Sequence, residues 1–383
     1  MSKEKLLMTP GPTMVPHEVL ATQSEVMIHH RTPEYGKLFT EMNENLRYLY
    51  QTNNTIISYS ASGTGGLEAS VVNFFSPGDK ILVISIGVFG NRYAAIAQSF
   101  GLNVVKIDVP WGQGVDPKEV EKYLAEGGFK AVFATHNETS TGAVNDIKAI
   151  SQVLKGQDLL FIVDAVSSLG AIELQTDLWG IDVVISASQK AIMCPPGLAF
   201  MSVSPKAWEA AEKSTCPKFY WDILKAKKAL EKNPPQNPFT PPISLVRGVN
   251  MALKLIKKEG LAAIFARHNR LAQATQAGVE ALGLKLFAAP AARSSCITSV
   301  ALPENLDGNK IRSIMEEKYG VIIAGGQEHL KGKIIRIGHM GYVNENNVYE
   351  TFTALEKTLQ ELNYNVQLGT GVQAAQEAYN KAL

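Results

Sequence analysis

The feature that most constrains the fold is an alternation of short apolar strands and helical segments over the first half of the chain. Seven segments read as strands because they are short and continuously apolar. They are 56–59, 81–85, 103–108, 131–135, 159–164, 183–186 and 198–203. Helical patterns, such as 64–75 and 92–100, lie between them. Apolar strands separated by helices are typical of a parallel sheet covered on both faces, so the sequence predicts an α/β fold with a mostly parallel, seven-stranded sheet.

Two proline-rich segments divide the rest of the chain. Met8–Pro16 contains three prolines and a glycine, which predicts an extended arm. Lys232–Pro242 has five prolines in eleven residues and makes a stiff connector. Beyond it, helices and a few strands predict a smaller α+β domain. We expect an arm at 1–20, a large domain at 21–258 and a small C-terminal domain at 259–383.

Charge and cysteine content exclude several functional classes. The 383 residues include 37 basic and 36 acidic ones, for a net charge of +1, which does not indicate a nucleic-acid partner. No apolar run reaches transmembrane length, and the N-terminus lacks the apolar core of a signal peptide. Cys194, Cys216 and Cys296 lie too far apart for a disulfide framework or a CxxC metal site. We expect a cytoplasmic protein with no membrane partner and no metal.

One lysine stands out at the end of a predicted strand. In the stretch Asp182–Gly197 the strand ends at small polar residues, Lys190 follows, and Pro195-Pro196-Gly197 turns the chain. A lysine held at the end of a buried strand has its ammonium desolvated, which lowers its pKa and makes the amine available as a nucleophile. An ordinary loop lysine is the alternative on this pattern alone.

Three other strand ends carry polar or glycine residues. Ser60–Gly66 (Ser-Ala-Ser-Gly-Thr-Gly-Gly) leads into a helix, and such a turn can cradle a phosphate, although it matches neither a P-loop nor GxGxxG. Asp164 ends an apolar strand, where a carboxylate is costly unless a cation or donor meets it, or caps a helix. Thr135–Gly142 is polar and is either part of a site or a solvated loop. A phosphate cradle, a carboxylate and an amine together suit pyridoxal phosphate.

These motifs carry a resemblance to a known family. The chain resembles class V aminotransferases of the fold-type I (aspartate-aminotransferase-like) pyridoxal-phosphate enzymes, and among them the alanine–glyoxylate and serine–glyoxylate aminotransferases. The matching motifs are Ser62-Gly63-Thr64, Val163-Asp164-Ala165-Val166-Ser167-Ser168-Leu169-Gly170 and Ser188-Gln189-Lys190 followed by Pro195-Pro196-Gly197. The resemblance extends from Thr9-Pro10-Gly11-Pro12 to Arg336-Ile337-Gly338, and it implies a homodimer with shared active sites.

The resemblance implies a role for individual residues. Lys190 matches the Schiff-base lysine that also moves the substrate proton, and Asp164 matches the partner of the pyridinium nitrogen. The other implied cofactor-binding residues are Ser62, Gly63, Thr64, Phe89, Thr139, Gln189, Asn237 and Thr240.

Three of these positions carry a further expectation. Phe89 matches a ring that stacks on the pyridine, and its flanking glycines predict a loop. Thr240 matches a residue that crosses the dimer interface to the neighbouring phosphate. Asn237 stands where relatives have a tyrosine.

Two residues are implied to bind the substrate, Gly11 and Arg336. A guanidinium grips a carboxylate through two parallel hydrogen bonds, although an arginine that ends an apolar strand also suits a structural ion pair. The run His29-His30-Arg31 lies either near the active site or on the surface.

The predicted reaction is a ping-pong transamination between alanine or serine and glyoxylate or pyruvate, with aspartate or an aminophosphonate as other possible donors. A cysteine desulfurase or lyase of the same fold is an alternative, but the surroundings of Cys296 read as a strand, and Gln189 and Phe89 stand where such enzymes have histidines. A dinucleotide-binding oxidoreductase would need GxGxxG. A non-catalytic binding protein would give Lys190, Asp164 and Arg336 no reason to converge.

Overall fold

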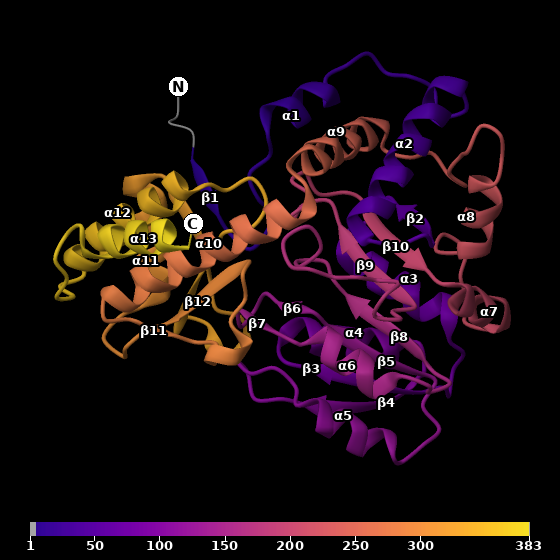
Figure 1. Cartoon of the computed structure of the whole chain (residues 1–383), viewed down its shortest axis with the longest axis horizontal. Coiled ribbons are helices and arrows are strands. Elements are labelled where there is room, and N and C mark those ends of the chain that lie inside the picture. The colour runs from indigo at the N-terminus through magenta and orange to yellow at the C-terminus, as the bar shows by residue number, and fades with distance from the viewer. Residues whose placement is uncertain (1–4, 383) are drawn as a thin grey trace.

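The computed structural model describes residues 5–382, and its larger β-sheet forms the larger of two lobes (Figure 1). This sheet has seven strands in the order β2-β10-β9-β8-β5-β3-β4. They are β2 (Thr55–Tyr59), β3 (Lys80–Ser85), β4 (Asn103–Asp108), β5 (Ala131–Thr135), β8 (Leu160–Asp164), β9 (Val183–Ala187) and β10 (Ala199–Val203). β10 is the only strand that runs antiparallel to the other six strands of this sheet. The predicted α/β fold with a mostly parallel seven-stranded sheet is confirmed.

The central strands are almost entirely apolar, as expected for a sheet that helices cover on both faces, whereas the edge strand β4 also carries Asn103, Lys106 and Asp108. In β3, Ile81 and Val83 belong to one apolar cluster, and Leu82 and Ile84 to another, as expected when side chains alternate between faces. The first face is covered by α3 (Gly63–Phe74), α4 (Val88–Ser99), α7 (Pro205–Lys213) and α8 (Ile223–Leu230). The second is covered by α1 (His17–Gln23), α2 (Pro33–Tyr50), α5 (Pro117–Leu124), α6 (Ile147–Leu154) and α9 (Ile243–Glu259).

The smaller lobe is an α+β unit, as the sequence predicts. Its five-stranded sheet has the order β1-β13-β14-β12-β11. The strands are β1 (Leu6–Met8), β11 (Lys285–Leu286), β12 (Ile297–Ala301), β13 (Val321–Gly325) and β14 (Ile334–Gly338). The helices are α10 (Leu261–Ala281), α11 (Gly308–Tyr319), α12 (Glu345–Glu361) and α13 (Thr370–Lys381). Helix α10 leads from the larger lobe into the smaller one (Figure 1).

The N-terminal arm does more than extend along the surface. Its strand β1 pairs in parallel with β13, with Leu6 opposite Val321, so the start of the chain belongs to the sheet of the smaller lobe. From there the arm crosses to α1 on the larger lobe. The domain bounds 1–20, 21–258 and 259–383 stay a prediction.

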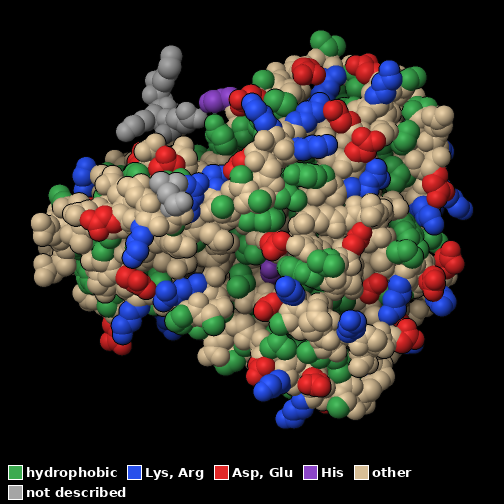
Figure 2. Space-filling model, viewed as in Figure 1, with side chains coloured by type: hydrophobic (Ala, Val, Ile, Leu, Met, Phe, Trp, Pro, Cys, Tyr) green, Lys and Arg blue, Asp and Glu red, His purple; other side chains and the backbone are tan. Residues whose placement is uncertain are grey.

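Basic and acidic side chains are intermixed over the face that Figure 2 shows, as a net charge of +1 leads one to expect. Within residues 5–382, no helix has the length and apolarity required to cross a bilayer.

Candidate active site

Lys190 lies directly under the N-terminal arm. It follows β9 and begins a turn that the Met193 N–H closes on the Lys190 carbonyl at 2.9 Å. Its Nζ donates to the Pro10 carbonyl at 2.6 Å. Thr13 adds two contacts, from its Oγ1 to the Lys190 carbonyl at 3.0 Å and from its N–H to the Gln189 carbonyl at 3.2 Å. The arm therefore fixes both the backbone and the amine of the predicted catalytic lysine.

The surroundings of Lys190 favour its neutral form. Burial and, to a smaller extent, the positive charge of Arg336 lower the pKa of the amine, and the negative charge of Asp164 opposes them; together these effects bring the pKa to about 8. A neutral amine is the form that acts as a nucleophile or base.

We expect Lys190 to react with a small aldehyde at a lower pH than an ordinary lysine does. Only the free amine attacks, so reductive labelling of the cofactor-free protein should rise with pH around a midpoint near 8. Peptide mass spectrometry at a series of pH values measures this midpoint, with the exposed Lys148 as an internal reference. A midpoint for Lys190 near the ordinary lysine value of 10.5 would contradict the prediction.

Gly11 lies against the Lys190 side chain, and a residue with a Cβ at this position would collide with it. Its φ is +126°, and a Cβ at this position would lie 2.4 Å from the Lys190 Nζ. We expect Gly11→Ala to displace the amine and to lower kcat by about 10²-fold, because a small misplacement of a catalytic group has a cost of this size. Steady-state kinetics measure the loss.

Gly127→Ala is the matched control for this substitution. Gly127 also has a positive φ, +71°, but a Cβ added there would meet no atom within 4 Å among the described residues. This variant should lose about 1 kcal/mol of folding stability and keep its kcat. Equal losses of kcat in both variants would show that Gly11 acts through backbone strain and not through Lys190.

Asp164 ends β8 with a buried carboxylate. Its Oδ1 accepts a hydrogen bond from the Val166 N–H at 3.0 Å. Burial and the negative charge of Glu138 raise the pKa of Asp164, while the Val166 hydrogen bond and the charges of Lys190 and Arg92 lower it; together these effects bring the pKa to about 6. A carboxylate that is costly to ionise in this way suits a cationic partner.

The predicted phosphate turn opens α3. Ser62 is the N-cap residue, yet its side chain makes no capping hydrogen bond, so the N–H groups of the first turn stay available to an anion. The Arg92 guanidinium donates to Thr64 Oγ1 at 3.2 Å. A Cβ at Gly63 would lie 2.9 Å from Val166 Cγ2, so this turn packs against the segment that follows Asp164. Gln189 Oε1 is buried, and no residue that the structure describes offers it a hydrogen bond.

The expectation that Phe89 lies in a loop is wrong. Helix α4 begins at Val88, and Phe89 lies in its first turn. The loop prediction fails because a distant carboxylate caps the helix: the N–H groups of Phe89 and Gly90 donate to Glu138 Oε2 at 2.9 and 3.2 Å. The Arg92 guanidinium lies over the Phe89 ring, 4.6 Å from its centroid.

Residues Thr135–Thr141 do not form a solvated loop, because all of them are buried. They include strand β6 (Asn137–Glu138), which pairs with β7 (Ala143–Val144), and Thr139 lies in the turn between the two. The hairpin thereby brings polar groups to the same edge of the sheet as Asp164.

Arg336 reaches this hairpin from the smaller lobe. It lies on β14 and donates from Nη1 to the Thr139 carbonyl at 2.6 Å and from Nε to the Gly325 carbonyl at 2.7 Å. Burial lowers the pKa of Arg336 to about 10, so the guanidinium keeps its charge at neutral pH. Within residues 5–382 no carboxylate forms an ion pair with it, which does not support the alternative of a structural ion pair.

Two predicted cofactor-binding residues lie apart from this group. The Asn237 side chain accepts from the Tyr35 hydroxyl at 2.5 Å, and the Asn237 carbonyl accepts from Arg31. Thr240 is exposed. In the part of the chain that the structure describes, no hydrogen bond joins either residue to Lys190, Asp164 or Gln189, so their roles stay predictions. Arg31 thus has a structural contact. The rings of His29 and His30 lie against one another in a tilted arrangement, with centroids 4.6 Å apart.

Three residues near the site were missed by reasoning from sequence. Glu138 stands in a run of polar residues with nothing to single it out, and Thr13 lies in an arm with no regular pattern. Arg92 had a usable signal, since it follows Phe89 by one helical turn and so lies on the same face of α4.

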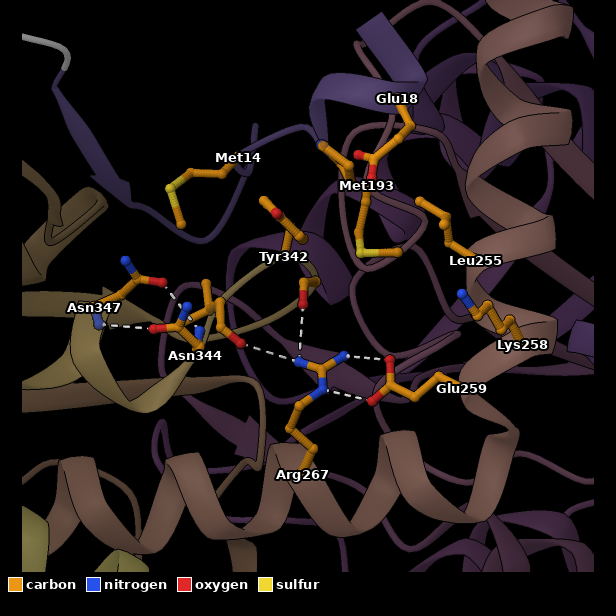
Figure 3. A pocket seen from close by; sticks show the side chains of 13 residues that line it. Met14, Glu18, Met193, Leu255, Lys258, Glu259, Arg267, Tyr342, Asn344 and Asn347 are labelled. Carbon is orange, nitrogen blue, oxygen red and sulfur yellow. Dashed lines mark hydrogen bonds and ion pairs between the residues drawn. The ribbon is translucent and has the colours of Figure 1, made fainter.

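A cavity of about 620 Å³ lies beside Met193, which belongs to the turn that follows Lys190 (Figure 3). Met193 and Gly341 line it, and so does Arg267, which binds the Glu259 carboxylate and the carbonyls of Gly341 and Val343. None of the predicted catalytic or binding residues lines this cavity. The amine of Lys190 is directed instead toward the arm.

Comparison with known proteins gives consistent matches over the chain. A family model described as aminotransferase class-V matches residues 6–350. The soluble hydrogenase small subunit of a Synechococcus species is 45% identical and covers 100% of both chains. The L-aspartate–glyoxylate aminotransferase of Paracoccus denitrificans is 37% identical over 100% of this chain and 98% of that relative. The structure of ureidoglycine–glyoxylate aminotransferase from Bacillus subtilis is similar with a TM-score of 0.95, at 30% identity and 99% coverage of each chain.

Proposed function

Because the chain belongs to the class V aminotransferase family, we propose that it transfers the amino group of a small amino acid to glyoxylate, with pyridoxal phosphate as its cofactor. The observation that carries this proposal is the buried amine of Lys190, which lies at the end of the sheet with a lowered pKa, close enough to Asp164 and Arg336 for their charges to act on it.

The residues present fit pyridoxal phosphate. When bound, this cofactor supplies an aldehyde carbon and an electron-withdrawing ring. The Lys190 amine would hold the aldehyde carbon, and the buried Asp164 carboxylate would hold the ring nitrogen in its protonated form. The free N–H groups at the start of α3 would bind the phosphate. Gln189 has an amide oxygen without a partner among the described residues, so its amide is free to turn its NH₂ group toward an anion.

The same residues account for the handling of the substrate. Arg336 is anchored by two backbone carbonyls and has no competing acid within residues 5–382, so its remaining N–H groups are available to the α-carboxylate of an amino acid. The neutral Lys190 amine would then take the proton from the α-carbon of the amino donor and, in the second half of the reaction, deliver a proton to the α-carbon of the acceptor. Because donor and acceptor use one site in turn, we expect ping-pong kinetics.

The names of two relatives narrow the choice of acceptor substrate. Two of them, from Paracoccus denitrificans and Bacillus subtilis, are named for glyoxylate, although their donors differ. Glyoxylate is the smallest 2-oxo acid, and it needs little more than the carboxylate contact that Arg336 offers. We therefore propose glyoxylate as acceptor and leave alanine, serine and aspartate as candidate donors.

A comparison of glyoxylate with pyruvate, made with several amino donors, tests the choice of acceptor. We expect kcat/KM for glyoxylate to exceed that for pyruvate by about tenfold or more, because one additional methyl group is worth a factor of this size in a closely fitting site. Coupled assays with serine, aspartate and an aminophosphonate as donors measure the ratios. Alanine is assayed with glyoxylate only, because alanine and pyruvate exchange amino groups without net reaction. A preference for pyruvate with every donor would contradict the choice of acceptor.

We propose the aminotransferase activity for this chain and not the hydrogenase activity for which one relative is named. Cys194, Cys216 and Cys296 are free and buried, and among residues 5–382 no group of three or more histidine, cysteine or acidic side chains is placed to hold a metal ion. The proximity of Lys190, Asp164 and Arg336 supports the proposal of an aminotransferase site.

We further propose that the protein is a homodimer with shared active sites. Large apolar side chains are exposed on the surface, with Val26 at 88% and Phe219 at 70% exposure. The exposed position of Thr240 also suits contact with a second subunit. The cytoplasmic location stays a prediction from composition.

A further inference from the structure

Glu138 is a buried carboxylate that the aminotransferase reaction described above does not use. Its Oε1 accepts from the Ser140 N–H at 3.1 Å and from the Ser140 Oγ at 2.6 Å. Its Oε2 accepts from the N–H groups of Phe89 and Gly90. Each carboxylate oxygen is thus shared by two donors, and the two pairs of donors belong to two different segments of the chain.

These bonds explain how a charge is tolerated in the core. Burial raises the pKa of Glu138, and its hydrogen bonds to Ser140, Gly90 and Phe89 lower it. The carboxylate also lies at the N-terminus of α4, where the helix dipole favours a negative charge. A glutamine would not replace it, because in either orientation its NH₂ group would leave at least one N–H donor unpaired: the Ser140 N–H, or those of Phe89 and Gly90.

The position of Glu138 connects the two ends of the site. On one side it fixes the first turn of α4, which carries Phe89. On the other side it fixes the β6–β7 hairpin, and the next residue, Thr139, offers its carbonyl to Arg336. Gly87 permits this approach, since a Cβ there would lie 2.5 Å from Glu138 Cγ. The charge of Glu138 also acts on Arg336 and raises the pKa of its guanidinium.

We propose that Glu138 is a positioning residue that sets, through one carboxylate, both the Phe89 ring at the cofactor site and the Arg336 guanidinium at the substrate site. This inference rests on the proposed function. It predicts that cofactor affinity and substrate affinity depend on the same buried charge, although Phe89 and Arg336 belong to different lobes.

The test is a pair of double-mutant cycles. In the cofactor-free protein, Glu138→Gln should raise the Kd for pyridoxal phosphate by about tenfold, as expected for a lost charge-assisted hydrogen bond. In a Phe89→Ala background the same substitution should change Kd by less than about twofold. In the intact enzyme, Glu138→Gln should raise KM for the amino donor more than it lowers kcat, and an Arg336→Lys background should remove most of the increase in KM.

Glu356→Gln is the matched control. Glu356 is also buried, and it caps α13 through the N–H groups of Gly369, Gly371 and Val372, far along the smaller lobe. This control should lose thermal stability and keep Kd and KM. Equal effects of Glu138→Gln in the parent and in both backgrounds would overturn the proposal, and so would a loss of stability with unchanged Kd and KM.

A second variant and a titration of the wild-type protein ensure that the test gives a clear result. If Glu138→Gln fails to fold, Glu138→Asp takes its place in both cycles, because it keeps the charge but is one methylene too short to reach both segments. The wild-type titration with pyridoxal phosphate separates the two proposals. Wild-type protein that does not bind the cofactor contradicts the proposed function, whereas additive cycles in protein that does bind it contradict only the role of Glu138.

Discussion

Lys190→Ala should abolish transamination, with a loss in kcat of about 10⁴-fold. The amine is the nucleophile and the base in the proposed reaction, and no second amine in the described residues donates to the Pro10 carbonyl as Lys190 does. The variant should also lose the visible absorption band that the bound cofactor gives to the wild-type protein. Steady-state kinetics and an absorption spectrum of the purified protein measure the two effects.

Lys148→Ala is the control for this prediction. Lys148 is exposed on α6, so its removal should leave kcat and the absorption band unchanged. A Lys190→Ala protein that keeps more than about one-tenth of the wild-type kcat would show that another group performs the proton transfer.

The second large effect is expected for Asp164→Asn. An ionised Asp164 would stabilise the protonated ring nitrogen of the cofactor, and removal of one partner of a buried ion pair has a cost of roughly 3–5 kcal/mol. We therefore expect kcat to fall by about 10³-fold. Asp158→Asn, at a fully exposed surface position, should leave kcat unchanged.

The same substitution should stabilise the cofactor-free protein. The folded-state pKa of Asp164 is raised from 3.8 to about 6, so the ionised side chain disfavours folding once the pH exceeds these values. At pH 8 asparagine removes this penalty, which is on the order of 3 kcal/mol, and Tm should rise. A fall in both Tm and kcat would indicate that Asp164 serves the fold and not the cofactor.

Much of the larger lobe could be predicted from the sequence because each of its strands is marked by a pattern within a few consecutive residues. Each strand is a short apolar run, and its burial on both faces follows from that composition alone. The candidate residues Lys190 and Asp164 were found for the same reason, since each directly follows or ends such a strand. The resemblance to class V aminotransferases then supplied their roles.

The features that could not be predicted depend on contacts between distant segments. Leu6–Met8 gives no strand signal of its own, and only its pairing with β13 makes it one. The glycines beside Phe89 predict a loop, but the cap of its helix comes from Glu138, on another segment. The burial of Thr135–Thr141 likewise results from the hairpin and from Arg336, which reaches it from the smaller lobe.

The most direct test of the proposed function is to locate the cofactor on the chain. Pyridoxal phosphate is added to the purified protein, the covalent link is made permanent by borohydride reduction, and the labelled peptide is identified by mass spectrometry. We expect a single labelled site at Lys190, and no such label in Lys190→Ala. A label on another lysine, or none at all, would contradict the central role of this amine.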